Sequence, residues 1–260
     1  MGVTSRWVVI NETRTSMKAL PTLLALFLVI NVALAQDIEK TLRPFNKIVA
    51  SHKVNLVLIP GDKESIRITY HGVNPKNIII DQSGRKVHVY LKDAKIFDIG
   101  ERRHNDPFNR RERYPFASVT AYVTFKDLRL IETRGDGEVY CDGRIESKSL
   151  KIRAYGDTDV RLAYIDARKL KARLYGENTL KILDGGAGHL SYKLYGENIL
   201  DSRGLESVTA STTIYGDGRV SLHTSEEVRL NSFGDPSVFV SGSPYISKGI
   251  VIGHTDIRRN

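Results

Sequence analysis

Cysteine and tryptophan are almost missing from this sequence, which has one of each among its 260 residues. A lone Cys141 cannot form an intrachain disulfide, a CxxC redox pair or a Cys/His zinc site. Disulfide-scaffold, zinc-finger and thioredoxin-like proteins are therefore excluded. The seven histidines are scattered without HxH or HExxH spacing, so we expect no metal ion and no other cofactor.

Basic residues are in excess, but no tract of them is present. The chain has 39 Lys and Arg against 30 Asp and Glu, a formal net charge of +9 spread along its length. This balance favours anionic partners without naming one. A basic–aromatic recognition motif is lacking, so we expect no nucleic-acid partner. A G-x-S-x-G element is also lacking, and no catalytic residue is assigned.

The longest apolar run lies near the N-terminus, where residues 23–30 are LLALFLVI. Lys18 precedes it, and Ala-Leu-Ala at 33–35 follows it directly before Gln36. A basic start, a short apolar core and small residues at the cleavage site are typical of a secretory signal peptide. A membrane span needs about 20 apolar residues. We therefore expect no membrane span.

The leader divides the N-terminal part of the chain. We predict a signal peptide over 17–35 and a linker over 36–44. Residues 1–16 have no place in such a leader and are predicted to be an untranslated extension, with Met17 as the initiator and Met1 as the alternative. The protein is expected to be exported, to the periplasm, the outer surface or the medium.

Short β-branched segments fill residues 45–130. In 54–59 (VNLVLI) and 86–91 (KVHVYL), apolar side chains alternate as in a strand with one buried face. The pattern predicts an all-β region without helices. It stops over residues 98–115, which predict a long exposed loop. Its arginines are candidate ligands for anionic groups: Arg102, Arg103, Arg110, Arg111 and Arg113.

An internal repeat fills residues 131–260. Six glycines recur at spacings of 21, 20, 20, 20 and 18, and apolar residues alternate on both sides of each: Gly135, Gly156, Gly176, Gly196, Gly216 and Gly234. The period suits a solenoid, and the alternation indicates strand, glycine turn, strand in each coil. A leucine-rich repeat would need the LxxLxLxxN signature, which is absent. We predict an all-β solenoid with turns at positive φ at the glycines.

An aromatic row stands directly before the glycines: Tyr155, Tyr175, Tyr195, Tyr215 and Phe233. The row has two interpretations. The four tyrosines are candidate ligand-binding residues, because exposed aromatic rings can hold sugars. Alternatively, the rings stack on each other and stabilise the solenoid. The structural alternative is the one we favour.

An acidic residue follows every glycine: Asp136, Asp157, Glu177, Glu197, Asp217 and Asp235. Like charges on successive coils repel unless they are compensated. Calcium could compensate, but the β-roll nonapeptide is absent. We expect turn hydrogen bonds to backbone N–H groups, with charge balance from Arg153, Arg173 and Lys193, three residues before their glycines.

The leader, the segment FNKIVASHKVNLVLIPG at 45–61 and the YGD/YGE repeats together resemble the head-GIN domain family, described as auto-transporter adhesins of Bacteroidetes-type envelopes. The resemblance covers about 44–253. It implies that 45–253 form one head-GIN domain with a right-handed β-helix-like fold outside the cytoplasm. It supplies no functional residues.

Two functions remain open. The first is a non-catalytic, adhesin-like or surface-structural module that binds a glycan or a cell-surface protein. The alternative is a polysaccharide lyase or glycosidase, for which the acidic row would have to supply paired carboxylates. Short turns leave little loop to build a cleft, so we favour the first. The oligomeric state is left open.

Overall fold

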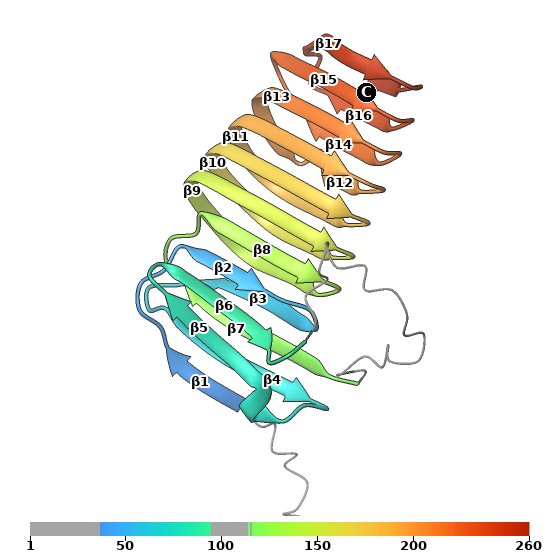
Figure 1. Ribbon diagram of the computed structural model, residues 1–260. Coiled ribbons are helices and arrows are strands. Elements are labelled where there is room, and N and C mark those ends of the chain that lie inside the picture. Colours follow the sequence, from blue (N-terminus) through green and yellow to red (C-terminus); the bar gives the residue numbers. More distant parts are fainter. Residues whose placement is uncertain (1–36, 95–113, 115, 260) are drawn as a thin grey trace, which may run out of the picture. The chain divides into compact units, whose positions relative to one another are not determined.

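The structure is a computed structural model, and it describes residues 37–94, 114 and 116–259. Of the residues that the structure describes, 72% are in strands and 1% in helix, which confirms the all-β prediction. Strands stack in successive coils along one axis (Figure 1). Within the described residues, no helix is long and apolar enough to cross a membrane.

The N-terminal part combines antiparallel and parallel pairs. β4 lies antiparallel to both β1 and β7, and β5 lies antiparallel to β6. β2 pairs with β6 and β3 with β7 in parallel. The strands are β1 (Asp37–Thr41), β2 (Lys47–Ala50), β3 (Val54–Pro60), β4 (Ser65–His71), β5 (Ile78–Ser83), β6 (Lys86–Leu91) and β7 (Ser118–Phe125).

Two features of this part differ from the sequence-based expectations. A strand, β1, occupies most of the segment expected to be a linker, and all five of its residues pair with β4. A short 3-10 helix, η1 (Pro75–Asn77), interrupts the strands where none was expected. Its N-cap is Asn74, whose Oδ1 accepts a hydrogen bond from the backbone N–H of Lys76 at 3.0 Å.

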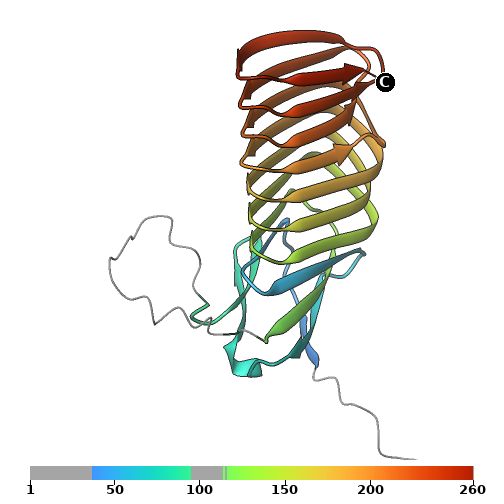
Figure 2. The same ribbon diagram turned by 90° about the vertical axis from the view of Figure 1, so that its right-hand side faces the viewer.

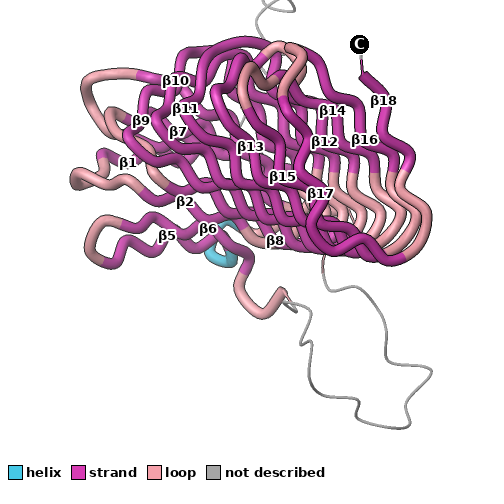
Figure 3. The backbone as a smooth tube through the Cα atoms, turned by 90° about the horizontal axis from the view of Figure 1, so that it is seen from above, coloured by secondary structure: helices cyan, strands magenta, loops and turns pink. Residues whose placement is uncertain are grey.

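The second part is a β-solenoid of about six turns, as predicted. All pairs among its strands are parallel, and the coils stack in Figure 2 and enclose a common interior in Figure 3. Its strands are β8 (Leu130–Gly135), β9 (Glu138–Gly156), β10 (Asp159–Gly176), β11 (Thr179–Tyr195), β12 (Ile199–Ser202), β13 (Leu205–Tyr215), β14 (Arg219–His223), β15 (Glu227–Phe233), β16 (Ser237–Ser241), β17 (Tyr245–Ile252) and β18 (Asp256–Arg259).

The strand register follows the sequence repeat. Leu170 of β10 lies opposite Leu150 of β9 and Leu190 of β11, a shift of 20 residues per coil. Parallel pairing also crosses from the first part into the second, because β8 pairs with both β2 and β9. The right-handed winding implied by the family resemblance stays a prediction.

The core of the solenoid includes the residues that alternate about the glycines. The apolar residues four positions after each glycine are all buried: Val139, Val160, Leu180, Leu200, Val220 and Val238. Ser202 is a polar member of this core. Its side chain is fully buried, and its Oγ accepts a hydrogen bond from the hydroxyl of Tyr192 at 3.0 Å. Ser202 Oγ in turn donates to the carbonyl of Ser221 at 3.3 Å.

Buried asparagines stabilise the turn edge from within. The side-chain amides of Asn178 and Asn198 donate at 3.0 Å to the carbonyls of Tyr175 and Tyr195. Asn198 Oδ1 also accepts from the backbone N–H of Asn178 at 3.1 Å. The amides thus satisfy backbone groups that a buried turn would leave unpaired.

The two ends of the solenoid are different. Antiparallel strands cover the first end, whereas β17 and β18 pair on one side only with described strands. In β17, large apolar side chains are exposed: Tyr245 to 73%, Ile250 to 59% and Ile252 to 60%. The last described coil therefore has an open edge.

Candidate functional site

The repeat glycines line one edge of the solenoid. All six have φ between +100° and +126°. At Gly196, a Cβ atom would also lie 2.5 Å from the carbonyl oxygen of Gly176 on the preceding coil. A left-handed backbone and a close approach of backbone together require glycine here.

The aromatic row forms one continuous stack. Its ring centroids are 4.6 to 4.9 Å apart and its rings are 1° to 5° from parallel, from Tyr155 to Phe233. Both faces of Tyr175, Tyr195 and Tyr215 are therefore covered by neighbouring rings. A sugar ring has no face to stack on at these three residues, and only ring edges and hydroxyl groups face outward. This geometry favours the structural alternative.

The acidic row makes hydrogen bonds to the backbone at several coils. Asp217 Oδ1 accepts from the N–H of Asp235 at 2.8 Å, and Asp235 Oδ1 accepts from the N–H of His254 at 2.6 Å. Asp136 accepts from the Lys53 ammonium group at 2.8 Å. Burial raises the pKa of Asp136, but the hydrogen bond and the charge of Lys53 bring it below its ordinary value.

The expected charge balance between Arg153, Arg173, Lys193 and the acidic row is not found. None of the three cations forms an ion pair with an acidic-row residue in the described part of the chain. Arg153 instead contacts Glu132, with Nη1 3.3 Å from Oε2. The reason is distance, since three strand residues place the cations roughly 10 Å before the turn.

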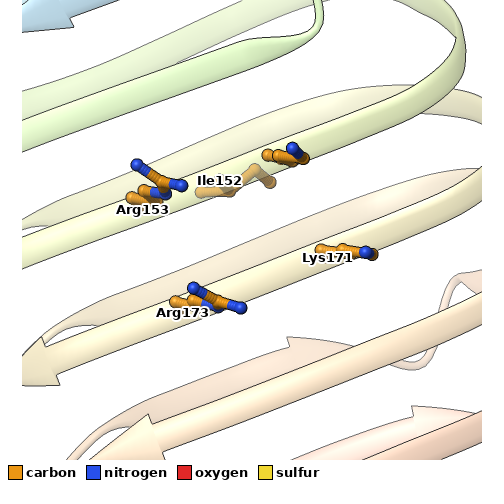
Figure 4. Close-up of a pocket in the computed structure, with 5 residues that line it drawn as sticks. Ile152, Arg153, Lys171 and Arg173 are labelled. Carbon is orange, nitrogen blue, oxygen red and sulfur yellow. The ribbon is translucent and has the colours of Figure 1, made fainter.

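Two columns of basic side chains follow the outer face of the strand before the turn. Lys151 lies opposite Lys171, and Arg153 lies opposite Arg173, which lies opposite Lys193. Four of these residues and Ile152 line a groove (Figure 4). The four are Lys151, Arg153, Lys171 and Arg173. The column of Lys151 and Lys171 is visible in the sequence, because each lysine stands five residues before a repeat glycine.

A third column continues the polar surface. Lys169 lies opposite His189, which lies opposite Thr209. His189 Nδ1 is 2.8 Å from Thr209 Oγ1. Burial lowers the pKa of His189, and the charges of Lys169 and Lys171 lower it further. The surface around this histidine is thus electropositive.

One carboxylate ends the basic columns. Glu132 is only 6% exposed and lies opposite Arg153 on the preceding coil. Its Oε1 also accepts from Arg134 Nε at 2.9 Å. The guanidinium groups of Arg134 and Arg153 compensate the buried charge of the Glu132 carboxylate.

Three of the described histidines contact hydroxyl groups. Ser51 Oγ is 2.9 Å from His88 Nε2, and Ser241 Oγ is 3.2 Å from His223 Nδ1. These contacts join neighbouring strands in the same way as the pair of His189 and Thr209. Among the described residues, no group of His, Cys, Asp and Glu could hold a metal ion. The three contacts are hydroxyl–imidazole pairs.

The predicted arginine loop cannot be placed on this surface. Its five arginines lie outside the described residues, as do the predicted leader and the residues before it: Arg102, Arg103, Arg110, Arg111 and Arg113. The binding role proposed for that loop stays a prediction.

Residues 44–244 match the family model described as "Putative auto-transporter adhesin, head GIN domain". The chain belongs to this family. No curated protein matches it. The family is one of adhesins by its description, and the match includes both the N-terminal strands and the solenoid.

Solved structures share the fold at low sequence identity. A "putative adhesin" from Bacteroides fragilis is 18% identical, with a TM-score of 0.69 over 86% of this chain and 96% of that chain. A "putative adhesin" from Parabacteroides merdae is 16% identical, with a TM-score of 0.59 over 86% and 95%. A "Putative lipid binding protein" from Parabacteroides distasonis is 15% identical, with a TM-score of 0.62 over 86% and 96%.

Proposed function

We propose that this chain is an exported, non-catalytic, adhesin-like module that binds a glycan of the cell surface or its surroundings. The observation that carries the proposal is the outer face of the strands before the turn, where columns of basic and hydroxyl side chains repeat once per coil. Such a face is an extended recognition surface of the kind that solenoids provide. Membership of the adhesin family and the leader-like N-terminal segment support the same function.

Three residues of the acidic row, Asp136, Asp217 and Asp235, give no support to the alternative of a polysaccharide-active enzyme. A glycosidase needs one carboxyl group with a raised pKa as the general acid. The pKa of Asp136 is shifted in the opposite direction. Asp217 and Asp235 use their carboxylates to hold backbone N–H groups of the next coil. These groups are engaged as turn residues.

A glycan array tests the proposal. The chain from residue 36 onward, which forms one compact unit, is applied to an array of neutral and anionic polysaccharides. Each bound polysaccharide is then incubated with the protein, and reducing ends are measured. We expect binding without release of reducing ends. Release would show an enzyme, and absence of binding to every glycan would contradict the proposal.

A further inference from the structure

We infer that the ligand is a linear anionic polysaccharide with carboxylate or sulfate groups, held by a basic face. This basic face consists of Lys151, Arg153, Lys169, Lys171, Arg173 and Lys193. The inference rests on the proposed function and adds the site and the chemical class of the ligand.

Several arginines on the other surfaces of the solenoid have an acidic partner two residues earlier in the chain. The two side chains point the same way and form an ion pair at 2.7 to 2.8 Å: Asp159 with Arg161, Asp201 with Arg203, and Asp256 with Arg258. The pattern is local and repeats from coil to coil. It neutralises these three guanidinium groups within the fold.

The basic face lacks this pattern. Two residues before Lys151, Lys171 and Lys193 stand Ser149, Lys169 and Ser191. Apart from the contact between Arg153 and Glu132, the cations of the face make no ion pair with any described residue. Their charge is therefore available to a ligand.

Like charges also lie directly opposite one another on the basic face. Lys151 pairs in register with Lys171, and Arg153 with Arg173 and then Lys193. Such pairs on neighbouring strands are unfavourable for folding. The lowered pKa of His189, caused by burial and then by Lys169 and Lys171, is a sign of the same positive field. An anionic ligand would relieve this repulsion.

The arrangement suits a linear, regularly charged polymer. The columns repeat once per coil, so their charges are spaced by one strand separation, about 4.7–4.9 Å. An extended polysaccharide presents one sugar at a comparable rise, and its acidic groups can meet successive coils. Tyr155, Tyr175 and Tyr195 border the columns with hydroxyl groups that can bond sugar hydroxyls.

Two other polyanions fit less well. Single-stranded nucleic acid is bound largely by bases stacking on aromatic faces, and the faces of Tyr175 and Tyr195 are already covered by rings. A membrane surface is commonly bound by basic residues together with exposed apolar residues that insert. The aromatic side chains beside the basic face are half-buried in their own stack. Both are kept as outcomes of the test.

The test compares two double variants with the same loss of charge. The first is Lys171→Gln with Arg173→Gln, on the basic face. The control is Lys181→Gln with Arg219→Gln, whose exposed side chains lie on strands after the glycine turn. Binding to heparin, polygalacturonate and neutral dextran is measured by calorimetry at two salt concentrations, with melting temperatures as a check of folding.

We expect the unaltered protein to bind heparin or polygalacturonate, more weakly at high salt, and not dextran. The basic-face variant should bind about tenfold more weakly, and the control should bind as the unaltered protein does. An equal loss in both variants would overturn the site, because net charge alone would then explain binding. Tighter binding to single-stranded DNA or to phosphatidylserine vesicles would overturn the ligand class. Array binding to neutral glycans alone would overturn this inference and leave the proposed function standing.

Discussion

Replacement of Gly196 by alanine tests how strictly the turn edge depends on glycine. The residue has φ of +100°, beyond the range of about +50° to +70° that non-glycine residues reach in the left-handed region. A new Cβ would meet the carbonyl oxygen of Gly176 at 2.5 Å. This oxygen belongs to the backbone of a parallel ladder and cannot rotate away. The coil must either open or distort.

The magnitude follows from two terms. A left-handed backbone costs an alanine about 1–2 kcal/mol. Forcing an extra methyl group into a packed site costs typically about 1–3 kcal/mol. Gly196→Ala should therefore lower the free energy of unfolding by about 2–5 kcal/mol.

Two other glycines separate these terms. Gly84 has φ of +55° and open space around its Cβ position, so Gly84→Ala should show the backbone term alone. Gly186 has neither a positive φ nor any atom within 4 Å of that position. Gly186→Ala should be neutral or stabilising by up to about 1 kcal/mol, because alanine restricts the unfolded chain.

Urea denaturation of the three variants provides the free energies by linear extrapolation. The expected order of stability is Gly186→Ala, then Gly84→Ala, then Gly196→Ala. If Gly196→Ala were as stable as Gly186→Ala, then the backbone approach of successive coils at the turn edge would not be as close as described here. The requirement for glycine at the repeat turns would then be refuted.

Three further predictions concern side chains. In a double-mutant cycle measured by urea denaturation, the losses of unfolding free energy caused by Tyr175→Ala and Tyr195→Ala should differ from additivity by about 0.5–1.5 kcal/mol, because each ring stacks on the other. Additive losses would contradict the stack. Cys141 is fully buried and burial raises the pKa of its thiol to about 11, so a disulfide reagent should label it slowly until denaturant is added; rapid labelling of the native protein would be inconsistent with that burial. The pKa of His189, measured by NMR, should lie below 6.5 and rise in Lys171→Gln. Because its folded pKa is lowered, His189 stabilises the fold above pH 6.5, and this contribution is lost as the pH falls through the folded pKa. An unchanged His189 pKa in Lys171→Gln would refute the contribution of the Lys171 charge to the shift.

The solenoid could be predicted from the sequence because its information is local and periodic. The glycine spacing fixes which residues of successive coils lie opposite one another, and the register of Tyr155, Tyr175 and Tyr195 agrees with it. The N-terminal pairing could not be predicted in the same way. β1 pairs with β4 across about 30 residues, and no repeat indicates which strands meet or in which direction.

The basic face was only partly predictable. The row of Arg153, Arg173 and Lys193 is visible in the sequence, but nearness along the chain indicates the wrong partners for it. In a solenoid the neighbour on the next coil is closer than a residue four positions away on the same strand. The repeat places Glu132 directly opposite Arg153 on the preceding coil, and these two residues therefore form the ion pair. The same register places Lys151 opposite Lys171 on this outer face.

The open edge at β17 and β18 has a consequence for cooperativity. In a stack where each coil touches only the next, folding resembles a one-dimensional lattice, and the free energy of opening depends on how many interfaces are lost. The last described coil has one such interface, and the exposed Tyr245, Ile250 and Ile252 contribute little burial to it. We therefore expect fraying to begin in this coil, and we expect the protection of amides against hydrogen exchange to increase coil by coil toward β10 and β9.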